Sequence, residues 1–197
     1  MPKRKRCRKF YKELRDNLSG ELVFEKSQAI CKQVLESEEY KNAGTIFAYY
    51  PLGNEVNCLP VMEQALTDGK CLVLPRTGCD YRMDFYEIKG LDDVEEGNFH
   101  VMEPRADCKA FLPHVPVTDI KCGEFLVLVP GVVFDHYGNR YGYGKGYYDR
   151  YFARFPYLIR MAPAYTEQLS EEPLECLETD VKMQIIVTEN EIIRTNT

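Results

Sequence analysis

The pattern of apolar residues changes period along the chain, so that strand-like runs alternate with helix-like stripes. Short apolar runs bounded by turn residues predict buried strands at residues 45–50, 71–74, 125–129, 158–163 and 185–187. Apolar residues at helical spacing predict helices over residues 3–18, after Ser19 as the N-cap, over residues 59–66 and from about residue 147. Residues 82–88 alternate apolar with polar and predict a more exposed, antiparallel strand.

This order of elements favours an α/β fold. We expect a single three-layer domain over residues 1–197, with a mainly parallel central sheet and helices on both faces. A chain of 197 residues is long enough to bury one sizeable core and leaves little for a second. Residues 91–119 predict a long irregular connection that still packs, and the residues after 187 predict a polar tail.

The first predicted helix has an apolar side and a basic side. The side expected to pack inward is formed by Cys7, Phe10, Tyr11, Leu14 and Leu18. Arg4 and Arg8 stand one turn apart on a neighbouring face, with Lys12 next in line. The basic run at residues 3–6 also fits a nuclear address, a nucleic-acid arm or a solvated helix end.

Composition excludes several classes. The net charge of −6 argues against general nucleic-acid binding, and no apolar run approaches the roughly 20 residues of a membrane span. A basic start without a following apolar segment predicts no secretory signal. The eight cysteines are scattered without a C-x-x-C pair, which predicts reduced thiols in the cytoplasm rather than disulfides or a zinc site. The three histidines, His100, His114 and His136, suggest no clear role.

Residues 125–154 contain the most informative chemistry. A buried strand ending at Pro130-Gly131 is followed by a loop rich in glycine and tyrosine, and then by a helix. Glycines let backbone N–H groups approach phosphate oxygens, Lys145 adds a positive charge, and Asp149 in the first helical turn offers a ligand for Mg²⁺. Such a loop can also be only a tight connection. It is neither a Walker A loop nor a dinucleotide fingerprint, because its lysine and glycine spacings differ from both.

A second candidate position follows the first predicted strand. Glu55 lies just beyond the carboxyl end of that strand, where ligands gather in open α/β sheets. A loop carboxylate or an N-cap charge is the alternative interpretation. Tyr50, at the end of the strand, offers an aromatic face to a flat ligand.

Motifs in order along nearly the whole chain resemble those of the 5-formyltetrahydrofolate cyclo-ligase (5,10-methenyltetrahydrofolate synthetase) family. The central block is formed by Pro130-Gly131, Phe134-Asp135, Gly138-Asn139-Arg140 and the run from Gly142 to Asp149. Outside it, the resemblance includes the basic first helix, Glu55, Leu74-Pro75-Arg76, Glu103-Pro104, Glu167-Gln168 and Asp180.

The resemblance implies a three-layer α/β enzyme that uses ATP and Mg²⁺ to cyclise 5-formyltetrahydrofolate to 5,10-methenyltetrahydrofolate, releasing ADP and phosphate. It implies ATP contacts at Arg4, Arg8, Arg140, Tyr141, Gly142, Tyr143, Gly144, Lys145, Gly146, Tyr147 and Tyr148. It implies folate contacts at Tyr50, Glu55, Tyr143, Gly144, Lys145, Gly146 and Tyr147. Metal ligands would be Asp149 and Asp180, and the catalytic cations Lys145 and Arg140.

The chain departs from the family pattern at Tyr143, where Arg or Gly is frequent, and at Gln184, where a carboxylate is common. Two other functions remain open on sequence grounds. One is a sugar-phosphate or CoA-ester enzyme of similar fold, and the other is a non-catalytic nucleotide- or RNA-binding module that uses its basic helix. For the cyclo-ligase we expect a monomer whose partners are folate and ATP, with no nucleic acid or membrane partner.

Overall fold

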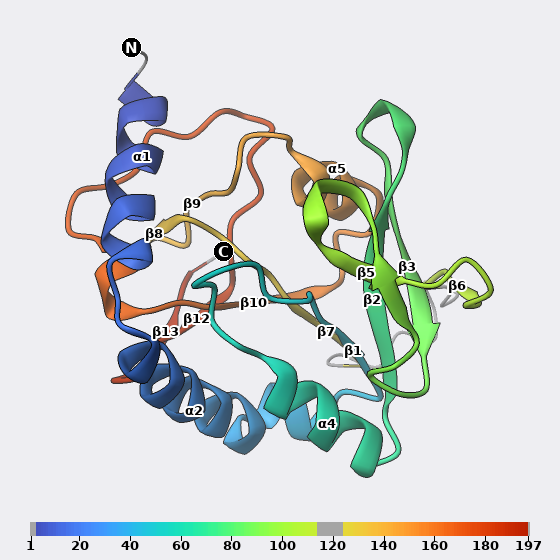
Figure 1. Cartoon of the computed structure of the whole chain (residues 1–197). Helices are drawn as coiled ribbons and strands as arrows, with labels where there is room; N and C mark the ends of the chain where they lie inside the picture. Colours follow the sequence, from blue (N-terminus) through green and yellow to red (C-terminus); the bar gives the residue numbers. More distant parts are fainter. Residues whose placement is uncertain (1–2, 114–123, 197) are drawn as a thin grey trace.

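A computed structural model describes residues 3–113 and 124–196 and is built on one large twisted sheet (Figure 1). The strand order is β13-β12-β10-β7-β1-β2-β3-β6, and the neighbours from β12 to β2 pair in parallel. The strands are β1 (Thr45–Phe47), β2 (Cys71–Thr77), β3 (Met83–Ile88), β6 (Ala110–Phe111), β7 (Phe125–Leu128), β10 (Ile159–Pro163), β12 (Ile185–Val187) and β13 (Ile192–Arg194). The predicted α/β class with a mainly parallel central sheet is confirmed.

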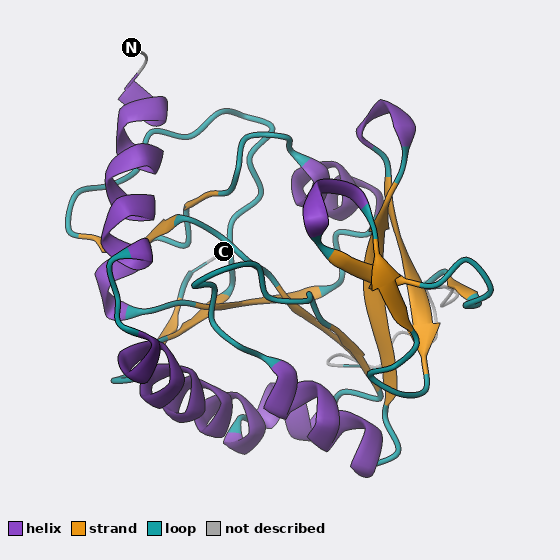
Figure 2. Cartoon of the chain, viewed as in Figure 1, coloured by secondary structure: helices purple, strands orange, loops and turns teal. Residues whose placement is uncertain are grey.

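Helices cover both faces of this sheet (Figures 1 and 2). One face packs against α2 (Gly20–Glu36), α3 (Glu38–Asn42) and α4 (Leu59–Thr67), and the other against α5 (Tyr147–Arg154). The alternation along β1 explains this arrangement, because Ile46 packs with the α2 and α4 side chains while Phe47 packs with the aromatic residues of α5. The strands are buried on both faces, as expected for a parallel sheet.

Helix α1 (Lys3–Asp16) instead packs beside a small three-stranded sheet, β11-β8-β9 (Figure 1). Its strands are β8 (Val133–Asp135), β9 (Arg140–Tyr141) and β11 (Leu169–Ser170), and a short helix (Thr166–Gln168) precedes β11. A separate hairpin is formed by β4 (Val94–Glu96) and β5 (Met102–Pro104). The glycine-rich connection therefore starts from the small sheet and ends at the helix that covers the large one.

Helix α1 corrects one expectation. The side formed by Phe10 and Leu14 is exposed, whereas Arg15 is buried with only 2% of its surface accessible. Cys7 and Tyr11 pack against Tyr141 and the small sheet, and Leu18, beyond the end of the helix, packs against the main core. The apolar stripe is therefore confirmed in part, because Phe10 and Leu14 face solvent while a basic residue outside the stripe is buried.

Two other segments differ from the sequence prediction. The supposed polar tail contains β13, which pairs antiparallel with β12 at the edge of the large sheet. The connection from residue 91 contains β4, β5 and β6, and its last part, residues 114–119, lies outside the described residues. Ser19 caps α2 as predicted, since its side-chain oxygen accepts a hydrogen bond from the Leu22 N–H.

The helices in the described ranges are all too short or too polar to cross a membrane. Six cysteines in these ranges are free thiols, namely Cys7, Cys31, Cys58, Cys71, Cys108 and Cys176. His100 and His136 are exposed, and His114 lies outside the described residues.

Candidate active site

The glycine-rich connection begins at a β-hairpin that Asp135 holds in shape. This carboxylate is buried and accepts hydrogen bonds from the backbone N–H groups of Tyr137, Asn139 and Leu174, and from the Asn139 side chain. Gly138 has φ +82°, and a Cβ there would lie 2.3 Å from the Met183 carbonyl oxygen. Only glycine fits this turn, which fixes where β9 delivers the loop.

Arg140 ties the start of the loop to the start of α5. Its guanidinium donates to the Pro130 carbonyl at 3.2 Å and to Asp149 Oδ1 at 3.2 Å, and it lies over the Tyr148 ring. The Arg140 side chain is only 5% exposed. Of the two predicted catalytic cations, Arg140 is thus a buried brace beside Asp149, whereas Lys145 is exposed at the tip of the loop and lies 5.5 Å from the centre of the Tyr81 ring.

The predicted arginines of α1 reach the same loop. Arg8 Nε donates to the Gly142 carbonyl at 2.8 Å, and a Cβ added at Gly144 would lie 3.5 Å from the Arg8 guanidinium carbon. Arg4 and Arg8 both lie over the ring of Tyr141. The structure therefore brings together residues that lie more than 130 positions apart in the sequence.

The loop ends in an open turn at the start of α5. Gly144 and Gly146 have φ +91° and +66°, a region that side-chain-bearing residues rarely adopt. Tyr147 is half-buried and lines a cavity of about 490 Å³ between α5 and the connection of β2 to β3, together with Arg82, Arg150 and other residues. Gly144 is exposed, whereas Gly142 and Gly146 are half-buried.

The two predicted metal ligands lie in adjoining segments. Asp149 Oδ1 accepts from the backbone N–H of Val181, at 3.1 Å, so its carboxylate reaches the residue that follows Asp180. Asp180 Oδ2 accepts from Arg4, at 2.9 Å, and from the Leu177 N–H, at 2.8 Å. In the described part of the chain, each carboxylate keeps a second oxygen without a hydrogen-bond donor, and no group of three or more acidic, Cys or His side chains gathers.

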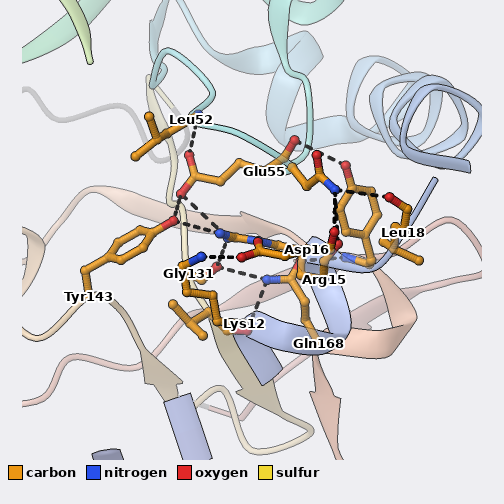
Figure 3. Close-up of polar contacts among 12 residues, drawn as sticks. Lys12, Arg15, Asp16, Leu18, Leu52, Glu55, Gly131, Tyr143 and Gln168 are labelled. Carbon is orange, nitrogen blue, oxygen red and sulfur yellow. Dashed lines mark hydrogen bonds and ion pairs between the residues drawn. The ribbon is translucent and has the colours of Figure 1, made fainter. Parts of the chain in front are cut away.

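Glu55 lies in a buried cluster on the other side of the loop (Figure 3). Its Oε2 accepts from the Leu52 N–H at 3.0 Å, and its Oε1 accepts from the Tyr143 hydroxyl at 2.7 Å. Burial raises the pKa of Glu55, and these hydrogen bonds together with the charge of Arg15 oppose part of that rise. Tyr50, by contrast, is half-buried against the α2 and α4 side of the core.

Arg15 is the residue of this cluster that sequence reasoning missed. It donates to the Tyr143 hydroxyl at 2.9 Å, and its Nη1 lies 3.7 Å from Glu55 Oε1. The spacing contained the signal, because Arg4, Arg8 and Arg15 share one side of a helix at i, i+4 and i+11. Lys12, which we had placed next in line, instead pairs with Asp16 at the surface.

Two other motif residues, Gln168 and Glu103, hold neighbouring segments together by hydrogen bonds. Gln168 donates to the carbonyls of Gly131 and Val132, which begin the segment leading to the loop. Glu103 accepts from the backbone and hydroxyl of Thr77 and joins the β4–β5 hairpin to β2. These polar side chains are buried or half-buried, which explains their place in an otherwise apolar interior.

Known proteins resemble this chain in both sequence and fold. A family model described as the 5-formyltetrahydrofolate cyclo-ligase family matches residues 1–189. A probable 5-formyltetrahydrofolate cyclo-ligase of Schizosaccharomyces pombe is 26% identical over 192 residues, covering 90% of each chain. The mouse 5-formyltetrahydrofolate cyclo-ligase is 27% identical over 185 residues, covering 88% of this chain and 87% of its own.

The fold is also that of a solved relative. The structure of Aquifex aeolicus 5,10-methenyltetrahydrofolate synthetase superposes with a TM-score of 0.82 at 27% identity, covering 98% of this chain and 93% of its own. The match of the family model over nearly the whole chain agrees with the motifs that converge on the glycine loop. The chain therefore belongs to the 5-formyltetrahydrofolate cyclo-ligase family.

Proposed function

We propose that this protein is an ATP- and Mg²⁺-dependent 5-formyltetrahydrofolate cyclo-ligase that forms 5,10-methenyltetrahydrofolate, ADP and phosphate. The observation that carries the proposal is the convergence of three remote segments on the glycine loop. Arg8 of α1 binds the Gly142 carbonyl, Glu55 binds Tyr143, and Asp149 contacts the backbone beside Asp180. A single phosphate does not need so many charged groups, whereas a triphosphate beside a second ligand does.

The loop and α1 form the proposed ATP site. The backbone N–H groups between residues 142 and 146 would hold phosphate oxygens, and Lys145 would neutralise the charge that spreads over the transferred phosphoryl group. Arg4 and Arg8 add positive charge at the start of the loop, while Tyr141 provides the surface on which both guanidinium groups rest. Phosphoryl transfer relies mainly on such positioning and charge neutralisation.

Asp149 and Asp180 fit a Mg²⁺ ion that ATP brings with it. Mg²⁺ is usually bound by one or two protein carboxylates, with phosphates and water supplying the other ligands. The two carboxylates project from adjoining segments, and each keeps an oxygen without a hydrogen-bond donor among the described residues. When bound, the ion would offset the charge of the phosphates. Arg140 and Arg4 hold the two carboxylates in place.

Glu55 and its neighbours form the proposed folate site. A pterin presents several N–H donors, and a buried, ionised carboxylate is the acceptor that recognises them best. Tyr50 would pack against the ring, and residues 143–147 would bring the formyl group to the γ-phosphate. The formyl oxygen attacks that phosphorus and ADP leaves; N10 then attacks the formyl carbon of the iminium phosphate, loses its proton and expels phosphate.

We further propose that the enzyme acts in the cytoplasm as a monomer. The free cysteines listed above fit a reducing compartment. The monomer proposal is supported by the origin of the site, since each of its side chains comes from this one chain.

The test is turnover by the purified protein. With Mg²⁺ and ATP, 5-formyltetrahydrofolate should give a methenyl product, followed by its absorbance, with one phosphate released per product. Substrate labelled with ¹⁸O in the formyl group should deliver the label to inorganic phosphate. ATP binding without turnover would instead support the non-catalytic module, and label released to water rather than to phosphate would exclude the phosphorylated intermediate.

A further inference from the structure

The cluster around Glu55 contains a buried cation to which the proposed reaction assigns no role. Arg15, in the last turn of α1, is 2% exposed. Its Nη2 donates to the Tyr143 hydroxyl, its Nη1 lies 3.7 Å from Glu55 Oε1, and Nη1 also makes a long hydrogen bond of 3.4 Å to the Gly131 carbonyl. Figure 3 shows Arg15 and Tyr143 pointing at the Glu55 carboxylate from different segments.

Burying this arginine runs against the pattern of its own helix. Helix α1 leaves Phe10 and Leu14 exposed, at 55% and 37%, while it turns Arg15 inward. Removing a guanidinium from water costs several kcal/mol unless charged and polar partners compensate. Cys7 and Tyr11 already anchor this helix to the small sheet, so the burial of Arg15 as well points to a local need for positive charge.

The hydrogen bonds around Tyr143 have a fixed direction. Arg15 can only donate, so the Tyr143 hydroxyl accepts a hydrogen bond from Arg15 and donates one to Glu55. Glu55 Oε2 is held separately by the Leu52 N–H. A carboxylate has about four lone-pair positions, so these contacts orient Glu55 and still leave acceptor positions for a ligand.

We propose that Arg15 is a positioning residue for folate binding, which acts on Glu55 through the Tyr143 hydroxyl and through its own nearby charge. The inference rests on the proposed function, in which Glu55 contacts folate. The charge of Arg15 favours the ionised form of Glu55, and its hydrogen bond to Tyr143 orients that hydroxyl toward the carboxylate. The glycine loop and the Glu55 carboxylate are thereby held in one arrangement before folate or ATP binds.

The test compares two substitutions with two matched controls. Arg15→Met removes the charge and keeps most of the length, while Tyr143→Phe removes only the hydroxyl. Lys9→Met changes an exposed cation of the same helix, and Tyr137→Phe changes an exposed tyrosine of the β8–β9 turn. For each folded variant we would measure the dissociation constants of 5-formyltetrahydrofolate and of a non-hydrolysable ATP analogue by calorimetry, and KM separately from kcat.

Arg15→Met and Tyr143→Phe should each weaken folate binding about tenfold and raise the folate KM more than they lower kcat. Because Arg15 contacts Glu55 through Tyr143 as well as directly, the loss in the double variant should be clearly smaller than the sum of the two single losses. Arg15→Lys should restore part of the affinity, and the two controls should bind like the wild type.

Three outcomes would overturn the proposal that Arg15 positions Glu55. These are unchanged folate affinity in folded Arg15→Met and Tyr143→Phe, additive losses in the double variant, or a melting temperature that falls while affinity per folded molecule stays constant. If Arg15→Met does not fold, Tyr143→Phe decides alone, because its ring is half-exposed. If the wild type binds no folate, the proposed function itself fails, which is a different result from equal binding by all variants.

Discussion

The two ends of the glycine loop are built in opposite ways. At the Glu55 end, Arg15 and Glu55 are buried, and the hydroxyl of the half-exposed Tyr143 connects them by hydrogen bonds from a third segment. At the Lys145 end, the chain is exposed and turns through Gly144 and Gly146 at positive φ.

This difference matches the two ligands that we propose. A flat heterocycle with a few N–H groups is best recognised by an acceptor that is already oriented and shielded from water. A triphosphate changes its charge distribution during the reaction, and accessible backbone groups with a long, hydrated lysine can follow it. Substitutions at the buried end should therefore change folate affinity, and substitutions at the exposed end should change phosphoryl transfer.

The largest effect is expected at Lys145. Lys145→Ala should lower kcat by about 10²–10³-fold, the typical result of removing one group that stabilises developing charge. The melting temperature should stay near that of the wild type, because the side chain is exposed. Steady-state kinetics and thermal melts check both, with Lys9→Ala as the matched exposed control. A lower melting temperature with normal activity per folded molecule would show that Lys145 is structural.

Asp149→Asn should have the next largest effect, a loss of about 10²-fold in kcat/KM together with a higher Mg²⁺ requirement. Asparagine keeps an oxygen that can accept from the Val181 N–H, so most of the local structure should remain. Asp107→Asn is the control, because Asp107 also pairs with an arginine, Arg105, but is exposed at the surface. An unchanged Mg²⁺ dependence in Asp149→Asn would contradict the metal assignment.

Glu55→Gln tests the buried end. It should weaken folate binding by about 2 kcal/mol, roughly 30-fold, since hydrogen bonds to a charged group contribute about 1.5–3 kcal/mol. Binding of the ATP analogue should change little. Calorimetry with each ligand checks this, and equal losses for both ligands would mean that the two ends are not separate sites.

The same residue predicts a pH dependence. Burial raises the pKa of Glu55, so on acidification this carboxylate takes up its proton at a higher pH than an ordinary glutamate. Folate affinity should fall in that range for the wild type but not for Glu55→Gln. The folded state binds more protons there than the unfolded state, so the Glu55 contribution to the free energy of unfolding decreases as pH rises through it. Denaturant titrations at several pH values measure this contribution.

The smallest effect is expected at Gly144. An added Cβ would lie 3.5 Å from the Arg8 guanidinium carbon, an ordinary contact, so the cost of Gly144→Ala is mainly backbone strain at φ +91°. Such strain amounts to about 1 kcal/mol, which should weaken the ATP analogue about fivefold. Gly69→Ala, at φ +71° in open space, is the control that should lower stability without changing ATP affinity.

Much of the fold could be predicted because local signals agreed with tertiary structure. The run at 125–129 became β7, Ser19 became an N-cap, and Tyr148, Tyr151 and Phe152 became the buried side of α5. The strands β9 and β11 were not predicted, because two residues are too few to show a period. The strand β8 was missed because it closely follows Pro130-Gly131 and was assigned to the loop.

The residues of the candidate site also differ in how far the sequence could predict them. Glycines, a lysine and a first-turn aspartate leave a local pattern, and Glu55 is marked by its place after a strand. The role of Arg15 depends on Tyr143 and Glu55, which lie 128 and 40 residues away, and on a helix whose apolar side misleads. Tyr143, doubtful on sequence grounds, became interpretable only with those partners in view.

The most direct test of the difference between the Glu55 end and the Lys145 end of the loop is a binding experiment with both ligands. Wild type, Lys145→Ala and Glu55→Gln would each be titrated by calorimetry with a non-hydrolysable ATP analogue plus Mg²⁺ and, separately, with 5-formyltetrahydrofolate. The account predicts that Lys145→Ala loses at least tenfold in affinity for the analogue and less than threefold for folate, and that Glu55→Gln shows the reverse. The account would be contradicted if both variants lost affinity for the same ligand, or if neither variant lost affinity for either ligand.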